Sequence, residues 1–188
     1  MYKFRYYIVN SITLYRIITA PVLLLLAVSG DLEVFKWLLA LSFFTDSIDG
    51  YLARKNHVHT KLGAVLDSIG DDLTVGAAII GILLFQPDFA RERLSFFTAL
   101  FILYSSQLIL ALIRYGRISS FHTYSAKISA VLQAVFLTLF FHIGPIYWLF
   151  YIAVIFTGLN LIEEIILVIM LPEWQHDVKG LYWYLTKK

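Results

Sequence analysis

The sequence predicts an all-α integral membrane protein with six transmembrane helices, both termini cytoplasmic, and a short interfacial segment at the N-terminus. Composition is the first reason, because 60% of the 188 residues are hydrophobic, only 15% are charged, and the mean hydropathy is +0.76. Apolar runs that recur along the whole length, with short polar connections between them, are the second. An uneven distribution of Lys and Arg is the third. We expect residues 1–188 to form a single membrane domain.

Each transmembrane helix needs about 20 residues to cross the hydrocarbon core, and six apolar stretches supply this length: 8–29, 33–54, 62–85, 94–115, 125–143 and 146–171. A polar tail follows at about 172–188. The first stretch is too long for a signal peptide and lacks a small-residue cleavage site, so we expect it to stay in the protein. The chain has no cysteine, which excludes disulfides and thiolate metal sites.

The basic residues predict the orientation. If alternate connections lie on opposite sides, three basic residues fall on one side (Lys36, Arg91, Arg93), one lies within the first span (Arg16), and eleven fall on the other side: Lys3, Arg5, Arg54, Lys55, Lys61, Arg114, Arg117, Lys127, Lys179, Lys187 and Lys188. By the positive-inside rule the richer side is cytoplasmic. Aromatic residues near both ends then fit an interfacial belt: Tyr2, Phe4, Tyr6, Tyr7, Trp174, Tyr182, Trp183 and Tyr184.

The segment DSIDGYLARKNHVHTKLGAVLDSIGDD holds five of the thirteen acidic residues. It joins the cytoplasmic ends of the second and third spans. Asp46 and Asp49 are three residues apart and Asp67 and Asp71 four apart, so each pair shares a helix face. Because the chain returns antiparallel, we expect the two pairs to converge near the membrane surface. Asp72 points about 140° away from Asp67 and belongs to a different environment.

Four converging carboxylates repel one another and need compensating cations in a low-dielectric site. Oxygen ligands without Cys suit Mg²⁺, Mn²⁺ or Ca²⁺ better than zinc, and the charge of four carboxylates equals that of two such ions. The alternative is a purely structural role, in which the acids reach water at the helix ends or pair with Arg54, Lys55 and Lys61.

Small and basic residues complete a pattern, Asp46-x2-Asp49-Gly50-x2-Ala53-Arg54-x8-Gly63-x3-Asp67-x3-Asp71. It resembles the signature of the CDP-alcohol phosphatidyltransferase family at every position. The resemblance implies a membrane enzyme that transfers a phosphatidyl group from a CDP-linked lipid, CDP-diacylglycerol, to a small polar alcohol and releases CMP.

The resemblance also implies the roles of the site residues. The four motif aspartates would hold two divalent ions, Mg²⁺ or Mn²⁺, and Asp71 would also be the general base. Gly50, Ala53, Arg54 and Gly63 would bind the cytidine nucleotide. The implied assembly is a homodimer in the cytoplasmic membrane, in bacteria the inner membrane, with its active site facing the cytoplasm; no nucleic-acid partner is expected.

The stretch VNSITLYRI resembles the Pro-Asn-x-Leu-Thr-x-x-Arg opening of the members that use glycerol phosphate, with Val9 and Ile12 in place of Pro and Leu. On this resemblance Asn10 and Thr13 join the nucleotide site and Arg16 faces the acceptor phosphate. Asn10 and Thr13 alternatively cap the first helix. Arg16 alternatively extends to the membrane surface.

A second basic group lies at the connection between spans four and five. Arg114, Arg117 and Lys127 suit an acceptor phosphate, and His122 is a weaker candidate. The alternative is that these charges only contact lipid headgroups. Glu163 and Glu164 in the sixth span receive no role.

The acceptor is predicted to be glycerol 3-phosphate, with serine and inositol phosphate as alternatives. Members that use glycerol phosphate often carry Pro and Lys where this chain has Ser68 and Asp72, and Leu-Asp-Ser is more similar to phosphatidylserine synthases. A membrane cation transporter is an alternative from another class, because intramembrane carboxylates also bind transported ions. A transport path needs polar residues across the bilayer, whereas spans two and three are apolar at their far ends. A non-catalytic scaffold leaves the motif unexplained.

Overall fold

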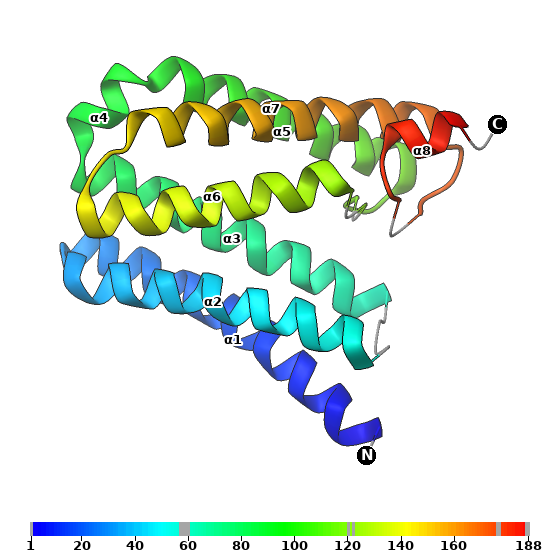
Figure 1. Cartoon of the computed structure of the whole chain (residues 1–188), viewed down its shortest axis with the longest axis horizontal. Helices are drawn as coiled ribbons and strands as arrows, with labels where there is room; N and C mark the ends of the chain where they lie inside the picture. Colours follow the sequence, from blue (N-terminus) through cyan, green and yellow to red (C-terminus); the bar gives the residue numbers. More distant parts are fainter. Residues whose placement is uncertain (1, 57–60, 120, 122, 176–177, 187–188) are drawn as a thin grey trace. The chain divides into compact units, whose positions relative to one another are not determined.

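The computed structural model describes residues 2–56, 61–119, 121, 123–175 and 178–186, without the side chains of 2–14, 16, 47–56, 61–65 and 67. Within these residues the chain is all-helical (Figure 1). Its eight helices are α1 (Tyr2–Ser29), α2 (Leu32–Asn56), α3 (Lys61–Phe85), α4 (Pro87–Glu92), α5 (Leu94–Tyr115), α6 (Tyr124–Ile143), α7 (Tyr147–Met170) and α8 (Leu181–Thr186).

Each predicted span coincides with one of the six long helices, and only 146–171 extends past its helix, by one residue at each end of α7. Four stretches within the described residues are long and apolar enough to cross a bilayer: Ser68–Phe85, Leu94–Tyr115, Tyr124–Ile143 and Tyr147–Met170. A shorter apolar stretch, Ile17–Ser29, lies in α1. The protein is therefore an all-α protein with several candidate membrane spans, whereas six crossings and cytoplasmic termini stay predictions.

Three features of the helices differ from the sequence-based prediction. The predicted interfacial N-terminal segment is continuous with the first span, because α1 is one helix from Tyr2 to Ser29. The short helices α4 and α8 were not predicted. In α4, Pro87 occupies the first helical position, where a missing N–H costs nothing, and Asp88 lies in the first turn, where a negative charge is favoured.

The chain divides into two compact units. Unit 1 contains residues 1–91 and 141–143, and unit 2 contains residues 92–140 and 144–188. Within unit 1, α1 packs closely against both α2 and α3, whereas α2 and α3 approach each other at only a few positions. Small buried residues allow the close approach: Ala20 and Ala27 on α1, and Ala77 and Ala78 on α3.

Buried hydroxyl groups in unit 1 are satisfied within their own helices. Thr19, Ser42 and Thr74 are each buried. The Oγ atom of each donates to the carbonyl four residues earlier, at 2.8, 2.9 and 2.8 Å respectively. This pairing lets a polar residue lie in an apolar helix interface without an unmet hydrogen bond.

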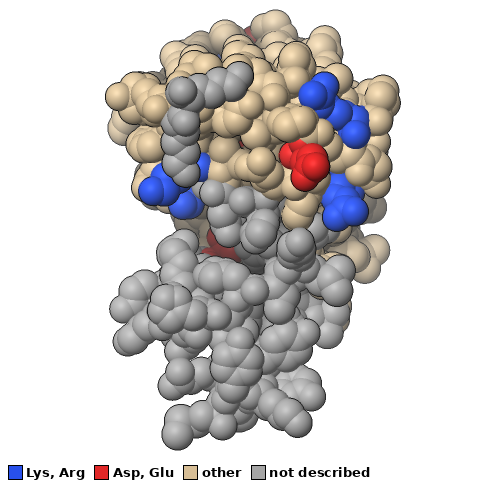
Figure 2. Space-filling model, turned by 90° about the vertical axis from the view of Figure 1, so that its right-hand side faces the viewer, with Lys and Arg blue, Asp and Glu red and all other residues tan. Residues whose placement is uncertain are grey.

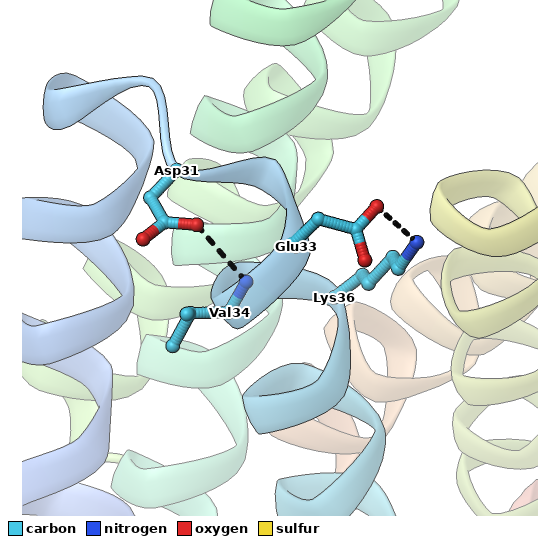
Figure 3. Close-up of polar contacts among 4 residues, drawn as sticks. All are labelled: Asp31, Glu33, Val34 and Lys36. Atoms are coloured by element: carbon cyan, nitrogen blue, oxygen red, sulfur yellow. Dashed lines mark hydrogen bonds and ion pairs between the residues drawn. The ribbon is translucent and has the colours of Figure 1, made fainter.

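The start of α2 is fixed by local capping (Figure 3). Asp31 precedes the helix, and its Oδ1 accepts the backbone N–H of Val34 at 3.1 Å. One turn later Lys36 Nζ donates to Glu33 Oε1 at 2.6 Å. A carboxylate that accepts an otherwise unpaired N–H is a strong signal for a helix start, and it sets where α2 begins.

An aromatic cluster packs α2 against α3 at the other end from the motif. The Phe35 side chain is fully buried, and its ring lies 5.3 Å from that of Phe85 and 4.9 Å from that of Phe141. Gly81 on α3 lies against the same ring, since a Cβ added there would be 2.5 Å from Phe35 Cζ. The glycine therefore allows α3 to receive the Phe35 ring.

In unit 2, α5 and α7 run parallel. Gln107 Nε2 donates to Glu164 Oε2 at 3.0 Å, and seven residues further along Arg114 Nε donates at 3.2 Å to the carbonyl of Leu171, the C-cap of α7. In the sequence, α6 connects α5 to α7. Its Gln133 Nε2 donates to Thr157 Oγ1 of α7 at 2.7 Å.

Arg93 holds the start of α5. Its guanidinium pairs with Glu92 at 2.6 Å and lies 4.6 Å from the centre of the Tyr147 ring at the start of α7. The hydrogen bond that Arg93 donates to Glu92 raises the pKa of Arg93 above its ordinary value, because it stabilises the charged guanidinium.

Candidate active site

The helices place the motif aspartates at two neighbouring helix ends. Asp46 and Asp49 lie in the last three turns of α2, and Asp67 and Asp71 lie in the first three turns of α3. Only residues 57–60 separate the two helices. The motif therefore lies on two helical arms joined by a short connection, as the sequence predicts.

The packing at the far end of these helices sets their register. Phe35 of α2 faces Gly81 of α3. Asp49 lies fourteen residues after Phe35 and Asp67 fourteen residues before Gly81. Because each residue advances a helix by about 1.5 Å, antiparallel helices that start level at Phe35 and Gly81 bring Asp49 level with Asp67.

The same register applies to the other two motif carboxylates. Asp46 lies eleven residues after Phe35, and Asp71 lies ten residues before Gly81. The contact of one aromatic ring with one glycine thus supports two levels about one helical turn apart, with Asp49 beside Asp67 at one and Asp46 beside Asp71 at the other. This is an inference from the helix register, because the side chains of Asp49 and Asp67 lie outside the described residues.

The carboxylates of α3 that the structure describes differ in exposure. Asp71 is partly buried, as is Asp46 on α2, whereas Asp72 is exposed. Helical periodicity likewise predicts that Asp71 and Asp72 lie in different environments. A partly buried carboxylate favours a bound cation more strongly than a fully solvated one, because water screens its charge less.

Carboxylate oxygens are the right donors for Mg²⁺ or Mn²⁺. Among the described side chains, no group of three or more His, Asp or Glu is close enough together to hold a metal ion. Of the four predicted ligands, only Asp46 and Asp71 have described side chains, so the complete ligand set stays a prediction. The remaining predicted site residues whose side chains lie outside the description are Asn10, Thr13, Arg16, Gly50, Ala53, Arg54, Gly63 and His122.

One polar group in unit 1 was missed by the sequence reasoning. The Tyr15 hydroxyl on α1 is buried and has no hydrogen-bond partner among the residues that the structure describes. A buried hydroxyl without a partner costs roughly 1–3 kcal/mol. The only sign of this hydroxyl in the sequence is a tyrosine within an apolar stretch, directly before Arg16.

The predicted basic group lies in unit 2, at the end that carries α8. Figure 2 shows Lys and Arg side chains gathered on this face, with acidic side chains between them. The exposed charged residues here are Arg114, Arg117, Lys127, Lys179 and Glu173. The first three are the predicted acceptor-phosphate residues, and all three are accessible to a soluble ligand.

Each of these three basic side chains contacts a neighbouring group. Arg114 Nε donates to the Leu171 carbonyl, which uses one of its five N–H donors. The Arg117 guanidinium lies 5.3 Å from the centre of the Trp174 ring, and Lys127 Nζ lies 5.2 Å from that of Tyr124. Cation–π contacts of this kind orient a side chain while leaving its donors available.

A buried polar network in unit 2 was also missed. Gln107 and Asn160 donate to Glu164, at 3.0 and 3.2 Å, and Gln107 also donates to Ser119. The neighbouring Glu163 accepts from Ser125 and from the backbone N–H of Leu181. The signal was present in the sequence, because Gln107 and Asn160 are amides inside long apolar helices, where polar groups need partners.

The curated proteins that match this chain are named as phosphatidylglycerophosphate synthases or as phosphatidyltransferases that use CDP-diacylglycerol. A probable phosphatidylglycerophosphate synthase of Mycobacterium tuberculosis is 37% identical over 79 residues, covering 39% of this chain and 38% of the relative. A CDP-diacylglycerol–glycerol-3-phosphate 3-phosphatidyltransferase of Rickettsia typhi is 38% identical over 77 residues, covering 39% and 43%. A CDP-diacylglycerol–inositol 3-phosphatidyltransferase of Saccharomyces cerevisiae is 39% identical over 66 residues, covering 35% and 30%.

The matched region spans less than half the length of these relatives. No solved structure matches the chain significantly. The family model described as CDP-alcohol phosphatidyltransferase matches residues 6–159, which contain the complete aspartate motif and most of the six long helices. The chain therefore belongs to the CDP-alcohol phosphatidyltransferase family.

Proposed function

We propose that this protein transfers a phosphatidyl group from CDP-diacylglycerol to an alcohol in a cellular membrane and releases CMP. The observation that carries the proposal is the complete motif from Asp46 to Asp71 on the facing ends of α2 and α3. Family membership gives the reaction class. The register set by Phe35 and Gly81 supports the convergence of the carboxylates that the reaction needs.

The proposed site holds two divalent ions, Mg²⁺ or Mn²⁺, on Asp46, Asp49, Asp67 and Asp71. Bound there, the ions would neutralise charge on the pyrophosphate and on the departing CMP. Asp71 accepts the proton of the acceptor hydroxyl, whose oxygen forms a bond to the phosphorus of the phosphatidyl group. The bond from that phosphorus to the CMP oxygen breaks.

The nucleotide part of the proposal rests on the small and basic motif positions. Gly50, Ala53 and Gly63 leave room for the cytidine nucleotide to approach the helix backbones. Arg54 supplies a cation for its phosphates. In this arrangement the acyl tails of the lipid remain in the bilayer, and the soluble acceptor enters from the cytoplasm.

We propose glycerol 3-phosphate as the acceptor. The partial N-terminal pattern at Asn10, Thr13 and Arg16 supports it, as does the exposed basic group of Arg114, Arg117 and Lys127. Relatives named for transfer to glycerol 3-phosphate match the same chain.

Serine and inositol phosphate are the competing acceptors. Ser68 and Asp72 stand where members that use glycerol phosphate often have Pro and Lys, and one matched relative is named for transfer to inositol. These two positions are the specific observation in favour of another alcohol.

The test uses purified protein in proteoliposomes with labelled CDP-diacylglycerol and Mg²⁺ or Mn²⁺. Glycerol 3-phosphate, serine, inositol, inositol phosphate and phosphatidylglycerol are supplied separately, and CMP release and the lipid product are measured. We expect the most product with glycerol 3-phosphate. Preference for serine would overturn the acceptor and leave the reaction class standing, whereas cation flux without CMP release would overturn the reaction class.

A further inference from the structure

The described residues after α7, 171–175 and 178–186 (the C-terminal segment), contact Arg114 and Arg117 directly and Lys127 through the Tyr124 ring. The Leu171 carbonyl accepts from Arg114 Nε at 3.2 Å. Trp174 faces the Arg117 guanidinium, and its own Nε1 donates to the Ile118 carbonyl at 3.1 Å. Two contacts from one tryptophan therefore fix both the Arg117 side chain and the backbone beside it.

Lys127 is connected to the same segment through the rings of Tyr124 and Trp183. Its Nζ lies 5.2 Å from the centre of the Tyr124 ring, and that ring lies 4.9 Å from the Trp183 ring of α8. The backbone N–H of Tyr124 also donates to the Lys179 carbonyl at 3.2 Å. The position of Lys127 at the start of α6 thus depends on where α8 lies.

Glu163 in α7 fixes the position of α8. Its Oε1 accepts the backbone N–H of Leu181, the first residue of that helix, at 2.7 Å. Its Oε2 accepts from Ser125 in the first turn of α6. A single carboxylate thereby joins the start of α6 to the start of α8 and satisfies an N–H that a short helix would otherwise leave unpaired.

Gly180, directly before α8, leaves room for the Glu163 carboxylate. Gly180 has a backbone φ of +144°, and a Cβ added there would lie 2.9 Å from Glu163 Oε1. Any other residue would be strained in this conformation and would displace the carboxylate. Glycine at position 180 is therefore needed both for the turn and for the approach of Glu163 to Leu181.

Apolar packing holds the rest of the segment. Val178, Leu181 and Tyr184 pack against a buried cluster made of Ala111, Phe121, Leu167, Val168 and Leu171. This packing favours docking of the segment but is not directional, whereas the Glu163 hydrogen bonds define one position along α7.

We propose that Glu163 and the C-terminal segment (171–175 and 178–186) are positioning elements, which hold Arg114, Arg117 and Lys127 in one arrangement that binds the phosphate of the acceptor. The inference rests on the proposed function, because it takes a phosphate-bearing acceptor as the ligand. Three long cationic side chains lose much rotamer freedom when they bind one phosphate, and prior orientation reduces that cost. Glu163 acts through the segment and does not touch the substrate.

The first test compares Glu163→Ala with the conservative Glu163→Gln, whose amide oxygen still accepts the Leu181 N–H. We expect Glu163→Ala to raise the acceptor KM about tenfold, while kcat and the CDP-diacylglycerol KM change less than about twofold. Glu163→Gln should recover most of the wild-type acceptor KM. The matched control is Thr157→Val, which removes the α6–α7 hydrogen bond from Gln133 but no contact of the C-terminal segment. It should leave the acceptor KM unchanged.

A second pair of variants tests the same inference at another contact. Trp174→Leu removes the ring beside Arg117 and the donor to Ile118, whereas Trp174→Phe keeps a ring. We expect the acceptor KM to rise in Trp174→Leu and to rise less in Trp174→Phe. Gly180→Ala should behave like Glu163→Ala although the carboxylate is retained.

Hydrogen exchange separates docking of the segment from binding of the acceptor. In Glu163→Ala, exchange at the Leu181 amide should accelerate, because its acceptor is gone. If exchange accelerates and the acceptor KM of both Glu163→Ala and Trp174→Leu stays at the wild-type value, the positioning role is wrong. If wild-type protein uses only acceptors without a phosphate, the proposed acceptor and this inference fail together.

Discussion

At the residue scale, the structure shows that two neighbouring aspartates differ in their exposure to solvent. Asp71 is partly buried and Asp72 is exposed. We expect alanine at Asp46, Asp49, Asp67 or Asp71 to lower kcat by at least about 100-fold, because each removes a ligand that stabilises charge in the transition state. Asp72→Ala should change it only a few-fold. CMP release with Mg²⁺ or Mn²⁺, with circular dichroism as the folding control, measures both, and loss in Asp72→Ala but not in Asp71→Ala would contradict the helix-face assignment.

Two tyrosines give a matched pair for stability. The Tyr115 hydroxyl lies 3.1 Å from the Val168 carbonyl and 2.9 Å from the Leu171 carbonyl, whereas the Tyr15 hydroxyl is buried without a partner among the described residues. We expect Tyr115→Phe to lower the unfolding free energy by about 1 kcal/mol and Tyr15→Phe to raise it by a similar amount. Thermal unfolding of the substrate-free protein in detergent measures both. A loss of stability in Tyr15→Phe would show that its hydroxyl is paired in solution.

At the element scale, the packing of α2 on α3 sets the register on which the candidate site depends. Gly81→Ala would place a methyl group 2.5 Å from the buried Phe35 ring, so we expect it to cost about 1–3 kcal/mol of stability. Gly76→Ala on the same helix meets nothing within 4 Å and should stabilise by up to about 1 kcal/mol through helix propensity. Thermal unfolding compares the two. Equal stability of both variants would contradict the register.

At the scale of the whole molecule, the six-span topology stays a prediction that the chain makes easy to test. Because the natural sequence has no cysteine, single cysteines can be introduced without background. We expect Ser29→Cys and Gln86→Cys to react with a membrane-impermeant maleimide added outside intact cells, and Glu173→Cys to react only in inverted vesicles. Labelling of Glu173→Cys from outside would reverse the orientation.

The assembly is a second prediction at this scale. The family resemblance implies a homodimer with a complete site in each subunit. Native mass spectrometry in mild detergent should show two chains per particle over a range of protein concentrations. Monomers alone at high concentration would contradict it.

The sequence by itself determined the six long helices, because an apolar stretch of about 20 residues in lipid must satisfy its backbone hydrogen bonds within a helix. It also indicated the reaction class, because the aspartate motif is local in the chain and resembles the signature of the CDP-alcohol phosphatidyltransferase family at every position. The family match over residues 6–159 agrees with that interpretation.

Only the tertiary structure decided what holds the polar residues outside the motif. Glu163 and Glu164 are adjacent in sequence, yet one joins α6 to α8 while the other accepts from Gln107 and Asn160. Their partners are up to 57 residues away along the chain, so neither periodicity nor composition identifies them. Hydrophobic pattern specifies which residues enter a helix, whereas the pairing of buried polar groups depends on which helices meet and in which register.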